Sequence, residues 1–416
     1  MLSDILEKRK QQPIQSTEIR ILWLLSVLAL IFELFHQFVS YSVLFRGYVY
    51  SLLWLIGCAF FKPRLIRTYK IRYFLLFFCF AFLYFLRGGT YPNLGALNLM
   101  FVLVIYYLVF PLFFFYYKKY CTARQIGISM FVLFVIVTYT LFRTAPFAIA
   151  QSTLIRQFVV DQELETKYMA LGVMSYALPH GIVPITPALC YGIKYVRDKI
   201  IRIISILLLI EIFALIFLSG ATTPMLIFFL VLFVSFIYNP YRSLRANWFK
   251  LAVIAVVLLL ITNESVLLFI FKLIYPLVEG TIFAAKIDEF ELILAHNAAY
   301  AEDVQSRGEF FSKTINTFFN NILFGSTNGA LLGGHNYFFD ILASIGLVGF
   351  IPFVANLVYI IKRSYNSLSR TIKGYYIIGI GSFIFMALTK NVFGSDFFIF
   401  PFLVLPCMLL IYDSKT

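Results

Sequence analysis

A succession of apolar stretches separated by short polar breaks constrains the fold of this chain more than any other feature. A helix needs roughly 20 mostly apolar residues to cross the hydrocarbon core of a membrane. With 61% hydrophobic and only 13% charged residues, the chain has more apolar surface than a water-soluble core could bury. We therefore expect an all-α, polytopic membrane protein in which residues 1–416 form one integral membrane domain. Its twelve expected spans lie near residues 19–40, 47–61, 73–86, 96–117, 125–142, 171–193, 200–218, 222–238, 249–262, 336–361, 373–389 and 396–412.

The basic residues are concentrated in alternate connections between these stretches. Twelve spans place both termini on one side, and that side carries 24 of the 34 basic residues. Basic connections usually stay in the cytoplasm, so we expect both termini to be cytoplasmic. The net charge of +14 is then a topology signal and does not indicate a nucleic-acid partner.

Two connections on the opposite, outer side are much longer than the others, at about residues 143–170 and 263–334. The second holds eight of the twenty acidic residues. Long loops in compact domains usually carry function. Part of this loop has the spacing of an amphipathic helix, which would lie on the membrane surface, over a cavity, or against the protein itself. Its apolar face comprises Phe310, Phe311, Ile315, Phe318, Phe319 and Ile322.

The most specific local pattern is Gly333-Gly334-His335-Asn336, where the second long loop re-enters the membrane. The two glycines permit a tight turn, and Asn336 is a favourable N-cap for the next helix. The positive end of that helix, beside His335, would attract an anion. Asp340 lies one turn further on and would orient neighbouring polar groups. Further along, Ala343, Gly346 and Gly349 form a small-residue strip, which predicts the close approach of another helix.

The spacing from His335-Asn336 to Gly346 and Gly349 resembles the motif of the O-antigen ligase and polymerase superfamily, and looks most like its polymerase (Wzy) branch. Upstream, residues 306–311 resemble the family's arginine-plus-aromatic stretch. Residues 321–325 resemble its Asn-Pro-x-x-Gly turn, although the proline is missing here. The paired Arg-x10-Gly patterns of some polymerases are not found after Arg143, Arg156 or Arg307.

This resemblance implies a glycosyltransferase of the bacterial inner membrane that polymerises O-antigen or capsular repeat units on the outer face. The donor would be a glycan on undecaprenyl diphosphate, and the acceptor a repeat unit on the same lipid. A chain-length regulator and a flippase would be further partners, and no metal or other cofactor is implied. His335 would activate the acceptor hydroxyl, because histidine titrates near neutral pH. Arginines would neutralise the departing diphosphate through their bidentate, permanently charged forks.

The residues expected at this site are His335 and Arg307 as catalytic groups, with Arg156, Arg143, Asn336 and Asp340 binding substrate. Two of the three arginines also have a simpler explanation. Arg307 has acidic neighbours in its own loop, and Arg143 would snorkel from a helix end. Arg156 lies in an apolar segment, where a charge is costly unless it has a partner.

Two other polar residues lie within predicted spans. His180 would face the same cavity or be a satisfied polar group in a kinked helix. Glu211 is alone in its span, and the sequence predicts no partner for it.

Two alternative functions fit the same topology. A ligase of the same superfamily would transfer the finished glycan to lipid A core. A flippase or other transporter of lipid-linked glycan would need polar residues in the middle of many spans. The spans here are poor in charge, which favours an enzyme.

Overall fold

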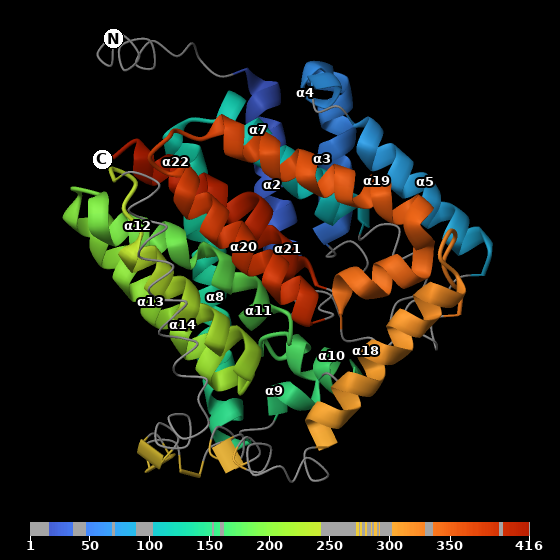
Figure 1. The fold of residues 1–416 in the computed structure, drawn as a ribbon. Coiled ribbons are helices and arrows are strands. Elements are labelled where there is room, and N and C mark those ends of the chain that lie inside the picture. The colour runs from blue at the N-terminus through green and yellow to red at the C-terminus, as the bar shows by residue number, and fades with distance from the viewer. Residues whose placement is uncertain are drawn as a thin grey trace.

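The computed structural model is a bundle of helices (Figure 1). Every regular element among the described residues is helical, which confirms the all-α prediction for that part of the chain. The structure describes residues 16–35, 47–68, 71–88, 103–151, 154–158, 162–242, 272–273, 275–276, 279–280, 284, 287–288, 291, 302–328, 336–390 and 394–415.

Four of the described helical segments are long and apolar enough to cross a membrane. They are α8 (Ala123–Ala150), α13 (Lys199–Ser219), α19 (Tyr337–Ser367) and the run Asp396–Asp413, which combines most of α21 (Ser395–Ile399) with η7 (Phe400–Val404) and α22 (Leu405–Asp413). Shorter apolar helices accompany them: α3 (Gly47–Phe61), α5 (Arg72–Leu86), α14 (Thr222–Ile237) and α20 (Lys373–Thr389). Large apolar side chains stay exposed along these helices, for example Ile203, Leu207 and Ile210 on α13. The chain is therefore a helical membrane protein whose outer surface suits lipid.

Most predicted spans coincide with helices. The bounds of α3 and α20 match the sequence prediction, and those of α5, α13 and α14 differ by one residue. The helix α2 (Thr17–Leu34) begins two residues before the first predicted span, and residues 36–40 of that prediction lie outside the described residues. The fourth is described from Leu103, through η3 (Ile105–Val109) and α7 (Phe110–Tyr120). The expected span at 249–262 lies outside the described residues.

The prediction placed the start of the first long loop, at about residue 143, too early. α8 continues past Arg143 and Pro146 to Ala150, so Arg143 lies within a helix and not beyond its end. A capping box at Thr122 and Gln125 fixes the start of this helix. The segment after α8 is largely helical as well, in α9 (Leu154–Gln157) and α10 (Gln162–Ala170).

The predicted span at 171–193 is a broken helix. Residues 173–175 have no regular structure, and α11 (Leu178–Ile182), the short η4 (Val183–Ile185) and α12 (Thr186–Tyr195) come next in series. Pro179, Pro184 and Pro187 each lie near the start of one of these pieces. Proline removes a backbone donor and disrupts a continuing helix, which explains why the span is assembled from segments.

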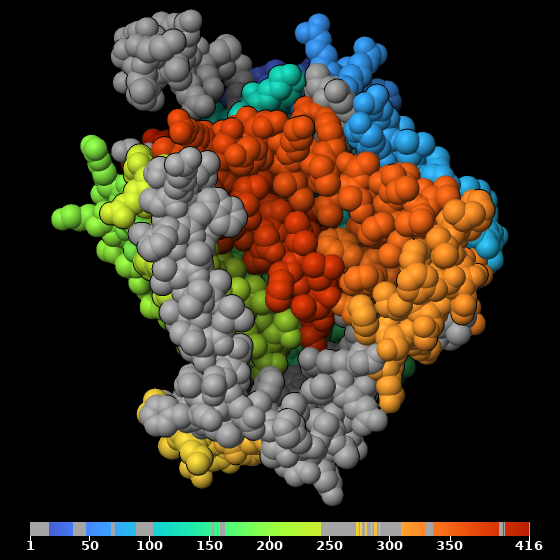
Figure 2. Space-filling view, viewed as in Figure 1, coloured from blue at the N-terminus to red at the C-terminus, as the bar shows by residue number. Residues whose placement is uncertain are grey.

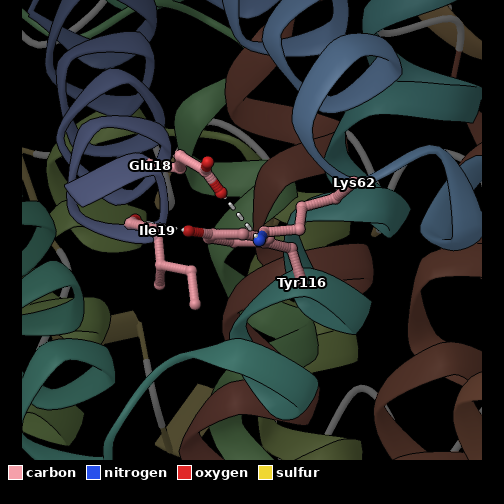
Figure 3. Close-up of polar contacts among 4 residues, drawn as sticks. All are labelled: Glu18, Ile19, Lys62 and Tyr116. Carbon is pink, nitrogen blue, oxygen red and sulfur yellow. Dashed lines mark hydrogen bonds and ion pairs between the residues drawn. The ribbon is translucent and has the colours of Figure 1, made fainter. Parts of the chain in front are cut away.

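The basic connections gather at one end of the bundle. The ion pair between Lys62 Nζ and Glu18 Oε2 measures 3.2 Å and joins the connection after α3 to the start of α2. Beside it, Tyr116 donates to the carbonyl of Ile19 at 2.6 Å (Figure 3). Lys118, in the last turn of α7, donates to the carbonyl of Ser367 at the end of α19.

The same end holds the start of α2 and the end of α22. Thr371, in the connection after α19, donates to Asp413 Oδ1 at 2.8 Å. Lys194, near the end of α12, donates to the carbonyls of Phe236 and Tyr238 at 2.8 and 2.9 Å. We call this end, with its connections after α3, α7, α12, α14 and α19, the basic end. It lies at the top of Figure 1.

Aromatic rings fill the centre of the bundle. Tyr107 on η3 packs against Phe353 on α19 and Phe398 on α21, at ring-centroid distances of 5.3 and 5.4 Å. Trp54 on α3 meets Phe113 on α7 edge to face at 4.5 Å. These contacts fix α19 and α21 relative to α3 and α7. They therefore hold in place the start of α19, which lies at the end opposite the basic end.

Candidate functional site

The end opposite the basic end contains the re-entry segment singled out by the sequence. Here α18 (Glu302–Asn320) lies on the surface beside the first turns of α19 (Figures 1 and 2). The amphipathic helix predicted in the second long loop is thereby confirmed as a helix.

The face that α18 presents to the protein matches the predicted one only in part. Thr314 and Thr317 are buried, whereas Phe319 is 63% exposed. Beyond the helix, Leu323 and Phe324 are 58% and 60% exposed. The helix thus contacts α19 through Thr314 and through an edge-to-face aromatic pair at 5.2 Å, and leaves the ring of Phe319 on the outside. That arrangement suits a helix at the membrane interface.

The turn after α18 is locked onto α19, backbone against backbone. Gly325 and Gly346 both have left-handed φ angles, of 69° and 63°. A Cβ on Gly346 would overlap the carbonyl oxygen of Leu323, and one on Gly325 would overlap that of Ser344. Only glycine allows so close an approach with this backbone.

Hydrogen bonds complete this junction and explain why α19 kinks at Gly346. The amides of Leu347 and Val348 donate to the carbonyls of Ile322 and Leu323 at 2.9 and 3.1 Å. In the other direction, the amide of Ser326 donates to the carbonyl of Ala343 at 2.8 Å. The small-residue strip therefore receives a turn at Gly346, while the helix α5 packs along α19 as well. The non-helical backbone at Gly346 interrupts the hydrogen bonds within α19. The amides and carbonyls released on either side of it are then available to the turn.

Asp340 connects the two helices. Its side chain is fully buried and accepts a hydrogen bond from Thr314 Oγ1 on α18 at 3.0 Å. The backbone amide of Asn336 approaches its other oxygen at 3.4 Å. Asn336 does occupy the N-cap position of α19, but its side chain makes no capping hydrogen bond. The carboxylate of Asp340, inside the first turn, instead contacts the backbone amide of this N-cap residue.

A second polar cluster lies beside the start of α19. The amide of Tyr337 donates to the carbonyl of Lys390 at the end of α20, at 3.3 Å. Ser175 Oγ donates to Asp396 Oδ2 on α21, and both residues are buried. Sequence reasoning missed Ser175, Lys390 and Asp396, because no local motif marks them and 221 positions separate the serine from the aspartate.

His180 belongs to this cluster, and among the described residues only one of its two ring nitrogens has a hydrogen-bond partner. Its Nδ1 lies 3.0 Å from the carbonyl of Tyr176, one turn earlier in the chain. Its Nε2 is buried without a hydrogen-bond partner among the described residues. Gly181 lets α11 pack directly on the backbone at Asp396, since a side chain there would overlap that carbonyl. The histidine faces the protein interior at the same end as Asn336.

Of the three predicted arginines, Arg143 is the one whose side chain the structure describes. Arg143 is exposed, and its Nε donates to the carbonyl of Leu171 at 2.9 Å. Neighbouring Thr144 accepts from the amide of Met174, directly before the Ser175–Asp396 pair. Arg156 falls in α9 and Arg307 in α18, but their side chains lie outside the described part. His335 itself lies outside the described residues.

The structure therefore brings Asn336 and Asp340 into contact and connects Arg143 to the same end through residues 171–175. Within the described ranges, no group of three or more His, Cys, Asp or Glu side chains is placed to hold a metal ion. No family model, curated protein or solved structure matches the chain.

Proposed function

We propose that this protein is a membrane glycosyltransferase that polymerises undecaprenyl-diphosphate-linked O-antigen or capsular repeat units. Two of the segments that resemble the polymerase family, residues 321–325 and 336–349, are separate in the sequence but form one structural unit. Gly325 and Gly346 meet backbone to backbone, and Thr314 ties α18 to Asp340. This junction is the observation that carries the proposal, because it joins the helix bearing Arg307 to the helix that begins just after His335.

The proposed orientation is based on the charge asymmetry. The basic end faces the cytoplasm, with both termini, and the α18–α19 junction faces the outside of the bacterial inner membrane. α14 ends at the basic end, whereas α18 and the start of α19 lie at the other end. The twelve-span prediction accounts for this change of side, because its span at 249–262 would carry the chain from the basic end to the opposite end.

The proposed reaction is a single displacement at the anomeric carbon of the donor. The acceptor sugar's hydroxyl oxygen forms the new bond to this carbon, and the bond from the carbon to the diphosphate oxygen breaks. The hydroxyl proton passes to His335, and the electron pair of the broken bond leaves with the lipid diphosphate. Arg307, Arg156 and Arg143 are the proposed cations for that diphosphate.

The other residues of the site hold this machinery in place. Asp340 fixes the first turn of α19 against α18, and Asn336 begins the helix beside the base. The exposed aromatic side chains of Phe319 and Phe324 support a position of the junction at the level of lipid headgroups, where the diphosphate of the proposed carrier lipid would lie.

The test is a complementation series in a strain lacking the gene. We expect His335→Ala and Arg307→Ala to abolish long glycan chains with normal amounts of protein in the membrane. Lys313→Ala, an exposed change on the same helix as Arg307, is the matched control and should leave the chain-length ladder intact. A normal ladder from His335→Ala would remove that residue from the mechanism.

The deletion itself separates the polymerase from its alternatives. A polymerase deletion leaves one repeat unit attached to lipid A core. Loss of all surface attachment, with polymer accumulating on the carrier lipid, would indicate a ligase. A transporter would move lipid-linked oligosaccharide in a purified system without changing its length.

A further inference from the structure

A groove lies between α8, α13 and α22 in the half of the bundle toward the basic end. Its volume is about 560 Å³, within the range of roughly 300–1,000 Å³ typical of small-molecule sites. Gly127, Phe131, Ile204 and Leu207 are among the residues that line it. Its walls are almost entirely apolar, so its occupant must be apolar along most of its length.

The groove is as long as one leaflet of a bilayer. Along α8 it runs from Gly127 to Thr138, and along α13 from Ile201 to Glu211. At 1.5 Å per residue these stretches measure about 15–17 Å, or half of the roughly 30 Å hydrocarbon core. A chain entering from the basic end would therefore reach the middle of the membrane.

A polar pair closes the inner end of the groove. Thr138 Oγ1 donates to Glu211 Oε2 at 3.1 Å. The other carboxyl oxygen, Oε1, is buried and accepts no hydrogen bond from any described residue. An acidic group within a membrane span is costly and tends to have a function. Here the pair marks the inner end of the apolar groove, and so limits the length of an apolar ligand chain that fits.

Cations lie at the mouth of the groove. Arg124 is exposed and precedes Gly127 by three residues, on the same face of α8. Lys415 is exposed and lies three positions after Tyr412, another lining residue. The nearby acids have other hydrogen bonds: Asp198 accepts from the first amides of α13, and Asp413 accepts from a threonine hydroxyl. The mouth thus presents positive charge where lipid phosphates lie.

We propose that this groove binds one acyl chain of an anionic phospholipid from the leaflet at the basic end. The lipid phosphate pairs with Arg124 and Lys415, and the chain extends along α8 and α13 to the Thr138–Glu211 pair. Charge complementarity at the mouth and the one-leaflet length select this occupant. The inference depends on the membrane assignment and is independent of glycosyl transfer.

Photolabelling of the full chain tests this site. The protein is placed in phosphatidylcholine nanodiscs that contain a small fraction of phosphatidylglycerol with a photoreactive group on its acyl chain. After illumination, we expect the label on peptides of α8 and α13, and we expect excess phosphatidylglycerol, but not phosphatidylcholine, to compete it away. Uniform labelling of all lipid-facing helices, or equal competition by both lipids, would overturn the proposal.

Two variants and a matched control sharpen the test. A Cβ at Gly127 meets no atom within 4 Å, so Gly127→Leu extends into the groove without a clash and should remove the label. Gly381→Leu on α20, where a Cβ also meets no atom within 4 Å, should leave labelling unchanged. The double variant Arg124→Gln/Lys415→Gln alters only exposed side chains and should abolish the preference for phosphatidylglycerol. Retained labelling in Gly127→Leu, or retained preference in the double variant, would contradict the assignment.

Discussion

Replacing Gly346 with alanine would disrupt the junction between α18 and α19 on which the proposed function depends. The residue has a φ of 63°, and its missing Cβ leaves the space that the carbonyl of Leu323 occupies. A non-glycine residue in the left-handed region costs roughly 1–2 kcal/mol. Forcing an extra methyl group against fixed backbone adds typically 1–3 kcal/mol, so the total is about 2–5 kcal/mol.

The same chemical change at Gly381 should have the opposite sign. Gly381 lies within the helix α20, and a Cβ there meets no atom within 4 Å. Alanine is preferred over glycine in a helix by about 0.5–1 kcal/mol, so Gly381→Ala should be neutral or slightly stabilising.

The assay is thermal unfolding of both variants, purified in the same detergent. An unfolding entropy of about 2.1 cal/mol/K per residue makes 1 kcal/mol worth about 1 °C in a chain of 416 residues. Gly346→Ala should therefore lower the midpoint by roughly 2–6 °C, while Gly381→Ala leaves it unchanged or raises it by about 1 °C. Equal midpoints for Gly346→Ala and the wild type would refute the backbone-to-backbone junction.

The described contacts support three further predictions. Thr314→Val removes a hydroxyl donor from buried Asp340 and should destabilise the protein by about 1–3 kcal/mol, with faster proteolysis after α18 as the readout. Lys194→Met removes the ammonium that donates to two backbone carbonyls at the end of α14, and should cost about 1.5–3 kcal/mol in the same unfolding assay. In intact cells, a membrane-impermeant maleimide should label a cysteine at exposed Phe324 and not one at exposed Arg64; the reverse pattern would invert the proposed orientation.

Uninterrupted apolar runs made much of the fold predictable from sequence. α13 and α14 each have a high density of apolar residues and a clear polar or glycine boundary. The end of α8 was not predictable in this way, because Arg143 and Pro146 look like interruptions of a span. The helix continues through both residues, and the arginine side chain reaches from it to the carbonyl of Leu171.

Local spacing predicted only part of the candidate site. Asn336 and Asp340 are one helical turn apart, and the structure brings them into contact. Ser175 and Asp396 meet only because the broken helix α11 packs against α21, which no local pattern encodes. The strip containing Gly346 signalled a close approach, but sequence alone did not show that the partner is a turn with a left-handed glycine of its own.

The decisive experiment for the proposed polymerase is reconstitution of the purified protein with undecaprenyl-diphosphate-linked repeat units, followed by electrophoresis of the released glycan. We expect a ladder of longer chains, formed with release of undecaprenyl diphosphate and lost in both His335→Ala and Arg307→Ala. Repeat units that remain single in the wild-type protein, or a ladder that persists in both variants, would contradict it.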